Sequence, residues 1–170
     1  SDRLGLAAPS GFGKTTFCKI LAGYEQPDEG QVLLDGKPLS EYKGYCPVQL
    51  IWQHPQEAVN PRRKMKTVLE EGGVLDERLI HGLGIEKEWM ERYPGELSGG
   101  ELQRFCIARA LGEKTSFLLA DEITAMLDLI TQSQIWNFLL EEVRSREIGL
   151  LVVSHSEPLL QRICTGRIQL

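Results

Sequence analysis

The sequence predicts an α/β fold, in which parallel strands alternate with helices and carry functional groups at one edge of a sheet. Three apolar runs predict it: residues 3–8 lead into a glycine-rich loop, residues 116–120 into two carboxylates, and residues 149–153 towards a histidine. An apolar pattern at helical spacing follows each run, as in a strand–helix unit. Because the carboxyl ends of parallel strands meet at one edge, we expect these groups to lie on the same side of the sheet.

Length and composition are those of one globular domain, or of one domain with an inserted subdomain. The 170 residues carry a net charge of −5, which argues against a surface that coats nucleic acid, so no nucleic-acid partner is expected. The only basic run, residues 62–66, is interpreted as a solvated face or a partner contact. The four cysteines are scattered without a CxxC pair and are interpreted as reduced thiols.

The loop at residues 8–16 predicts a phosphate-binding site, because it lies between a predicted strand and a predicted helix. Its glycines would let backbone N–H groups point inward. Lys14 would neutralise the β- and γ-phosphates of a nucleotide, and the Thr15 hydroxyl would bind Mg²⁺. Alanine stands at position 8, where the usual pattern begins with glycine, and the alternative is a chance glycine turn. The predicted nucleotide-binding residues of this loop are Ser10, Gly11, Gly13, Lys14, Thr15 and Thr16.

A second predicted anion site begins at Ser98, which precedes two glycines and an apolar helical pattern. Ser98 as N-cap and Glu101 three residues later form the sequence of a capping box. The first turn of such a helix offers unpaired N–H groups and a positive dipole end, which suit an anion bound by Ser98, Gly99 and Gly100. The alternative is an ordinary glycine-rich loop before a surface helix.

The carboxylates after residues 116–120 predict the chemistry at the edge of the sheet. Asp121 would hold Mg²⁺, directly or through water, and Glu122 would orient or deprotonate an attacking water. His155 follows a strand on the same edge and could reach a γ-phosphate. The alternative is a strand followed by an acidic turn, which the phosphate loop in the same chain disfavours.

Turn residues and apolar periodicity predict the other elements of the core. They comprise a strand and turn at residues 30–39, a strand at 48–52 that ends at Gln53, a helix at about 131–144, a helix at 157–164 and a final strand at 167–170.

Residues 54–96 differ in character, because prolines and glycines separate short amphipathic pieces. These pieces lie at residues 66–71, 75–81 and 86–92, and we expect them to form helices. The chain is thus predicted to be a P-loop NTPase (RecA-like) core with an inserted small helical subdomain. The expected division is a core of residues 1–56 and 105–170 and a helical subdomain of residues 57–104.

Taken together, these segments resemble the ATP-binding subunit of ABC transporters over nearly the whole chain. Two stretches are similar to the branch that energises oligopeptide, dipeptide and nickel importers: residues 53–55 followed by 59–62, and residues 92–96 before the Ser98 motif. In family order, the matching motifs are Walker A at residues 8–16, the glutamine loop at Gln53, the signature at 97–101, Walker B at 117–122, the D-loop at 125–128 and the switch histidine His155.

The resemblance implies a head-to-tail dimer, in which each ATP lies between Walker A of one subunit and the signature of the other. Asp128 would communicate across that interface. The implied partners are a second ATP-binding subunit and transmembrane permease subunits, and the implied location is the cytoplasmic face of the cell membrane. Implied roles are Glu122, His155 and Gln53 in catalysis, and Thr15, Gln53 and Asp121 at Mg²⁺.

Two other functions compete with transport-coupled ATP hydrolysis. A soluble ABC-type ATPase could act as a clamp in repair, translation or cluster assembly, although that class typically carries large insertions. A P-loop kinase of a small metabolite would explain Walker A and Asp121, but it would leave residues 97–101 without a role.

Overall fold

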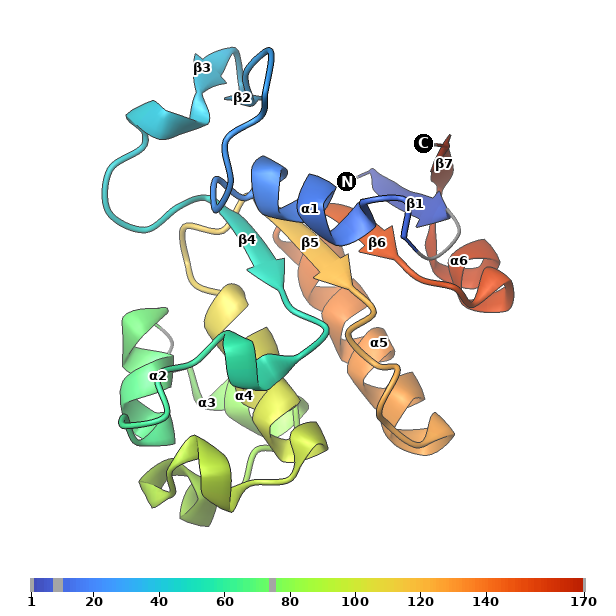
Figure 1. Cartoon of the computed structure of the whole chain (residues 1–170). Helices are drawn as coiled ribbons and strands as arrows, with labels where there is room; N and C mark the ends of the chain where they lie inside the picture. Colours follow the sequence, from blue (N-terminus) through green and yellow to red (C-terminus); the bar gives the residue numbers. More distant parts are fainter. Residues whose placement is uncertain (1, 8–10, 74–75, 170) are drawn as a thin grey trace.

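The computed structural model describes residues 2–7, 11–73 and 76–169 (Figure 1). Within them, five parallel strands form a sheet in the order β4-β5-β6-β1-β7, which confirms the predicted α/β class. The first and second apolar runs are therefore separated in the sheet only by the third. The strands are β1 (Arg3–Ala7), β4 (Val48–Ile51), β5 (Phe117–Asp121), β6 (Gly149–Val153) and β7 (Gly166–Gln169).

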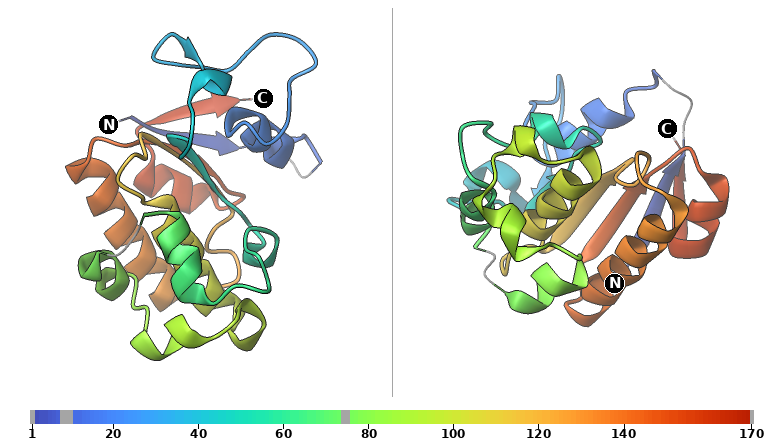
Figure 2. Two further views of the ribbon diagram at one scale, coloured as in Figure 1. Left: turned by 90° about the vertical axis from the view of Figure 1, so that its left-hand side faces the viewer. Right: turned by 90° about the horizontal axis from the view of Figure 1, so that it is seen from below.

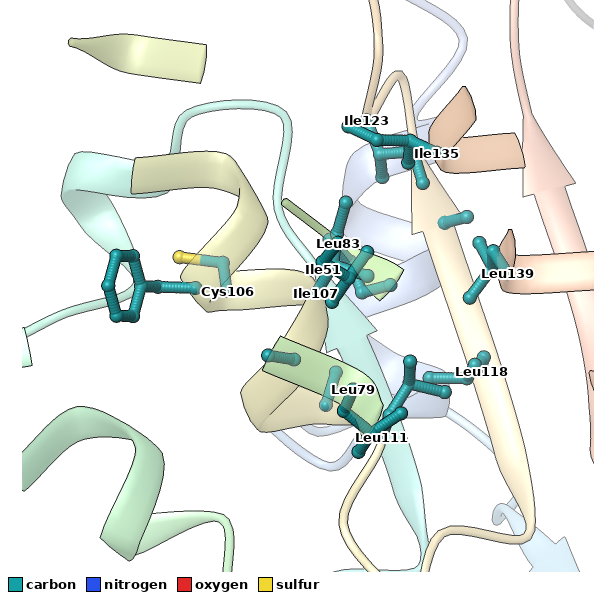
Figure 3. Close-up of a cluster of buried hydrophobic side chains, with 14 of the residues drawn as sticks. Ile51, Leu79, Leu83, Cys106, Ile107, Leu111, Leu118, Ile123, Ile135 and Leu139 are labelled. Carbon is teal, nitrogen blue, oxygen red and sulfur yellow. The ribbon is translucent and has the colours of Figure 1, made fainter. Parts of the chain in front are cut away.

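Alternate residues of the central strands point to opposite faces of the sheet, and each face has its own core. Leu118 and Ala120 of β5 belong to one buried cluster, whereas Leu119 belongs to the other. Figure 3 shows part of the first cluster, where Leu118 meets helix side chains such as Ile107 and Leu139. Helix α1 (Lys14–Leu21) covers the face of Leu119, and the opposite face is covered by α4 (Gly99–Ala110), α5 (Leu129–Ser145) and α6 (Glu157–Ile163).

The predicted strand and turn at residues 30–39 form a small antiparallel hairpin, β2 (Leu33–Leu34) and β3 (Lys37–Pro38), followed by the 3-10 turn η1 (Leu39–Glu41). Its tip, Asp35 and Gly36, has φ values of 51° and 77°, as a tight two-residue hairpin turn requires. The hairpin lies at the top of Figure 1 and of the left view in Figure 2, far from the green helices at the bottom.

The segment between β4 and α4 is helical, as predicted, and packs on α4. Helix α2 lies against α4, and α4 also contacts β4, so this segment continues the core of one sheet face. The expected division between residues 104 and 105 falls inside α4. The elements are η2 (Pro55–Glu57), α2 (Met65–Glu71), α3 (Glu77–Gly82), η3 (Lys87–Glu91) and η4 (Pro94–Glu96).

The amphipathic piece at residues 86–92 is helical, as expected, and forms the short 3-10 helix η3. Gly84 has a φ of 62°, which lies outside the right-handed helical region and separates η3 from α3. Pro94 favours an extended Tyr93 before it, and both Arg92 and Tyr93 are extended. These two features limit η3 at its two ends.

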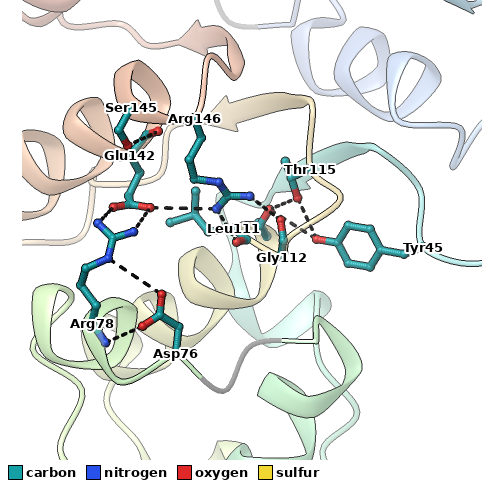
Figure 4. A network of polar contacts seen from close by, with 10 residues as sticks. Tyr45, Asp76, Arg78, Leu111, Gly112, Thr115, Glu142, Ser145 and Arg146 are labelled. Carbon is teal, nitrogen blue, oxygen red and sulfur yellow. Dashed lines mark hydrogen bonds and ion pairs between the residues drawn. The ribbon is translucent and has the colours of Figure 1, made fainter.

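A buried carboxylate joins three helices (Figure 4). Glu142 of α5 has no exposed surface, and both of its oxygens accept hydrogen bonds from Arg78 of α3. Arg146 lies 4.0 Å from Glu142 and donates to the carbonyls of Leu111 and Gly112, where α4 ends. The network satisfies carbonyls that a helix end leaves unpaired and holds α3 and α4 against α5.

No helix among the described residues combines the length and apolar character needed to cross a membrane.

Replacing Arg78 by alanine should lower the free energy of unfolding by about 2 kcal/mol, because it leaves Glu142 buried beside only the more distant Arg146. The value lies below the range for a fully buried pair, since Arg78 itself is half exposed. Urea denaturation measures it. Arg144→Ala, at an exposed position of the same α5, is the control and should change stability by less than about 0.5 kcal/mol. Equal losses in both variants would contradict the role of the network.

Candidate functional site

The loop before α1 has the backbone conformation that a phosphate cradle needs. Gly11 and Gly13 have φ values of 85° and 75°, which side chains rarely tolerate, and Gly13 is the N-cap of α1. Lys14 begins the helix and is only 8% exposed, whereas the glycines before it are exposed. The predicted Ser10 lies outside the described residues. The start of α1 therefore offers backbone N–H groups to an anion.

The second residue of α1 is tied to the end of β5. The Thr15 hydroxyl donates to Asp121 Oδ2 at 2.8 Å, across 106 residues of sequence, and Asp121 is only 3% exposed. A hydroxyl and a carboxylate are hard oxygen donors, the kind that Mg²⁺ takes together with phosphate oxygens and water. The residues present therefore fit a magnesium ion bound with a nucleotide. Thr16 follows on the exposed side of the helix.

Glu122 and His155 come together at the neighbouring strand ends. Glu122 has a φ of 50°, an uncommon value for a side chain of this size, and its N–H donates to Val153 at 3.0 Å. Glu122 Oε1 accepts from the His155 N–H at 2.8 Å and lies 3.5 Å from His155 Nε2. This backbone conformation turns the nearly buried carboxylate of Glu122 towards the loop that follows β6. Residues in uncommon backbone conformations are often found at functional sites.

Gln53 lies close to the same carboxylate. It follows β4 and lines a small cavity together with Glu122, Gly99 and Leu127, so four of the predicted motifs meet there. The other residues of the cavity are Pro55, Gln103, Ile123 and Met126.

The predicted capping box at the start of α4 is confirmed. Ser98 Oγ accepts from the Glu101 N–H at 3.3 Å, and Glu101 Oε2 accepts from the Ser98 N–H at 2.7 Å. Ser98 is exposed, so the first turn is open to a ligand. In Figure 1 the start of α4 and the start of α1, the two helix ends predicted to bind anions, lie apart within one chain.

Asp128, which was expected to act between subunits, is the N-cap of α5. Its Oδ1 accepts from the N–H groups of Ile130 and Thr131 at 3.0 Å each. Hydrogen bonds from Thr131 and from these backbone groups lower the pKa of Asp128. Three apolar side chains around this cap are well exposed: Met126, Leu129 at 82% and Ile130 at 74%. Leu129 and Ile130 begin α5 and Met126 precedes its cap, so exposed apolar side chains gather at this end of the helix.

Two buried polar residues were missed by the sequence analysis. Gln103 is 3% exposed and donates to the carbonyl of Trp52, the residue before Gln53. Glu142 lies at helical spacing from Ile135 and Leu139 on the buried face of α5. In each case the available signal was a polar residue within an apolar helical pattern.

The loop, the paired strand ends and the capped glycine helix occur in a chain that matches one known family. A family model described as "ABC transporter" matches residues 1–125, more than half of the chain. This chain belongs to the ABC transporter family. The matched span includes Walker A, the glutamine loop, the signature and Walker B, whereas His155 lies beyond it.

Relatives in this family include ATP-binding subunits of importers. The nickel import ATP-binding protein NikE of Rhodospirillum rubrum is 33% identical over 181 residues, covering 96% of this chain and 65% of the relative. The oligopeptide transport ATP-binding protein OppF of Streptococcus mutans is 31% identical over 180 residues, covering 94% of this chain and 58% of the relative. The chain thus spans less than two thirds of the length of these relatives.

The fold is that of solved ATP-binding cassettes. A dimeric structure of the cassette MJ0796 bound to ADP and Pi aligns with a TM-score of 0.85 at 23% identity, covering 99% of this chain and 81% of that one. The predicted P-loop NTPase fold with a helical insertion is therefore confirmed.

The reactivity of two buried cysteines, Cys18 and Cys106, reports on how tightly α1 and α4 pack. Burial, together with the nearby Asp121, raises the pKa of Cys18 in α1 to about 12, and burial raises that of Cys106 in α4 to about 11. Both thiols stay protonated at pH 8.5, and we expect the native protein to be alkylated by iodoacetamide at neither position. Mass spectrometry should find the half-buried Cys46 modified first. Equal rates at Cys18 and Cys46 would contradict the packing of α1 on the sheet.

Proposed function

We propose that this chain hydrolyses ATP in a nucleotide-sandwich dimer and thereby drives import of peptide or nickel-type solutes through a membrane permease. The observation that carries the proposal is the convergence of two pairs at one edge of the sheet. Thr15 is bonded to Asp121, and Glu122 is bonded to His155, in a chain of the ABC transporter family.

The loop and α1 would bind the phosphates of ATP. Backbone N–H groups of Ser10, Gly11 and Gly13 would surround the β-phosphate, and Lys14 would neutralise the β- and γ-phosphates. Thr16 would bind the α-phosphate of the nucleotide. Magnesium, when bound, would neutralise phosphate charge, and the oxygens of Thr15, Asp121 and Gln53 would hold it.

Glu122 would act on the water that attacks the γ-phosphate. Its carboxylate is fixed by the His155 N–H, so one oxygen is occupied and the other remains to accept a proton from water. The water oxygen would bond to the γ-phosphorus while the bond to the β,γ-bridging oxygen breaks, which yields ADP and phosphate. His155 Nε2 would face the γ-phosphate, and Gln53 would orient the water from the cavity that it shares with Glu122.

A second chain would complete the site. The start of α4 lies apart from the phosphate loop within one chain, so Ser98, Gly99 and Gly100 would bind the γ-phosphate held by a partner's loop. Asp128 would lie at this interface. The exposed apolar side chains Met126, Leu129 and Ile130 support a protein contact there, because isolated chains rarely expose such groups together.

The relatives support import as the process that ATP hydrolysis drives. NikE is named for nickel import and OppF for oligopeptide transport. The proposed division is a core of residues 1–56 and 105–170 and a helical subdomain of residues 57–104. The helical subdomain would bind the permease. Around the buried Met65, the exposed basic side chains of Arg62, Arg63, Lys64 and Lys66 are suited to an acidic partner surface. The subunit would then lie at the cytoplasmic face of the membrane.

Replacing Glu122 by glutamine should lower kcat for ATP at least about 100-fold and leave ATP affinity nearly unchanged, because the carboxylate acts on water and the loop binds the phosphates. Release of phosphate and binding of a fluorescent ATP analogue measure the two quantities. Glu147→Gln is a matched control, since Glu147 is an exposed glutamate with a similar φ of 55° outside the site. A Glu122→Gln variant as active as Glu147→Gln would contradict the proposed role.

A further inference from the structure

We infer that Gln103 is a positioning residue that makes the orientation of Gln53 follow the signature helix α4. The inference rests on the proposed function, in which Gln53 acts on the water and the metal. It assigns a task to a side chain of α4 that contacts neither phosphate nor water in that scheme.

One hydrogen bond links α4 directly to the peptide before Gln53. Gln103 Nε2 donates to the Trp52 carbonyl at 3.1 Å, across 51 residues of sequence. Gln103 lies one turn after Gly99 and Gly100, so any shift of the glycine turn moves its side chain with the helix. Since Gln103 is 97% buried, water does not readily replace this bond.

The Trp52 side chain is held from the other direction. Its ring packs edge to face on Tyr24 with 5.3 Å between centroids, and Lys19 Nζ lies 5.2 Å from the ring centroid. Lys19 belongs to α1, the helix that begins at the phosphate loop. The residue before Gln53 is therefore fixed between the helix of Walker A and the helix of the signature.

The second polar atom of the Gln103 amide is unsatisfied. Gln103 Oε1 is buried and has no hydrogen-bond partner within the part of the chain that is described. Gln103 and Gln53 line the same small cavity, which also contains Gly99 and Glu122. A buried amide oxygen without a partner is rare in native structures and suggests that a donor arrives in another state. The Gln53 amide, or a water that it holds, is the donor that this cavity would supply.

This arrangement gives the two atoms of one amide separate tasks. Nε2 keeps the backbone ahead of Gln53 at a fixed distance from α4. Oε1 would accept a hydrogen bond from Gln53, or from a water that Gln53 holds, when nucleotide is bound. Hydrolysis would then require the signature helix to be in place, whereas ATP binding by the loop of α1 would not. Loss of Gln103 should accordingly lower kcat and leave the affinity for ATP nearly unchanged.

The test compares Gln103→Leu and the nearly isosteric Gln103→Met with Gln49→Leu in the full chain. Gln49 is a matched control, because its Nε2 also donates to a backbone carbonyl, that of Cys46 at 2.7 Å, away from the site. We expect both Gln103 variants to lower kcat about tenfold or more, with KM for ATP within about twofold, since a small misplacement of an orienting group is costly. Hydrogen–deuterium exchange of residues 53–58 should accelerate in these variants and not in Gln49→Leu.

Unchanged kcat and unchanged exchange in Gln103→Met would overturn the inference, as would a loss of ATP affinity equal to the loss of kcat. If the parent chain hydrolyses no ATP, the proposed function fails instead. The exchange comparison then still decides the inference, because normal exchange of residues 53–58 in Gln103→Met would show that Gln103 does not anchor Gln53.

Discussion

The hydrogen bond between Thr15 and Asp121 joins the first turn of α1 to the carboxyl end of β5, and the rest of the site is arranged around it. It fixes the phosphate loop over the strand that also delivers Glu122. The sheet order places β6 between β1 and β5, so His155 reaches Glu122 from the adjacent strand end. Because all five strands of the described sheet are parallel, their carboxyl ends lie at one edge, and groups distant in sequence meet there.

Signals that depend on neighbouring residues were sufficient to predict much of the fold and the site. The capping box at Ser98, the glycines of the phosphate loop and the strands that end at Asp121 and near His155 each express a local backbone requirement, and the structure has them all. Tertiary partners were not predictable in this way. Glu142 is paired with Arg78 and Gln103 with Trp52, across 64 and 51 residues, and only the folded chain brings them together.

Two details of the structure go beyond the expectations. Residues 87–91 form a 3-10 helix that follows the positive φ of Gly84 and ends before the extended Arg92 and Tyr93, which precede Pro94. Asp128 was expected only at an interface, and it also caps α5 with two backbone hydrogen bonds. Both cap hydrogen bonds use Oδ1, so the second carboxylate oxygen of Asp128 stays available. The same residue can therefore fix the start of α5 and also contact a partner.

The central claim is that the signature helix of one chain completes the nucleotide site of another. Multi-angle light scattering of the Glu122→Gln variant, with and without Mg-ATP, tests it most directly, because hydrolysis cannot then reopen the dimer. We predict that ATP changes the mass from 19.1 kDa to twice that value, that Gly100→Asp abolishes the change, and that Gly95→Asp, at a glycine with open space around it, does not. A chain that binds ATP and remains monomeric would contradict the account.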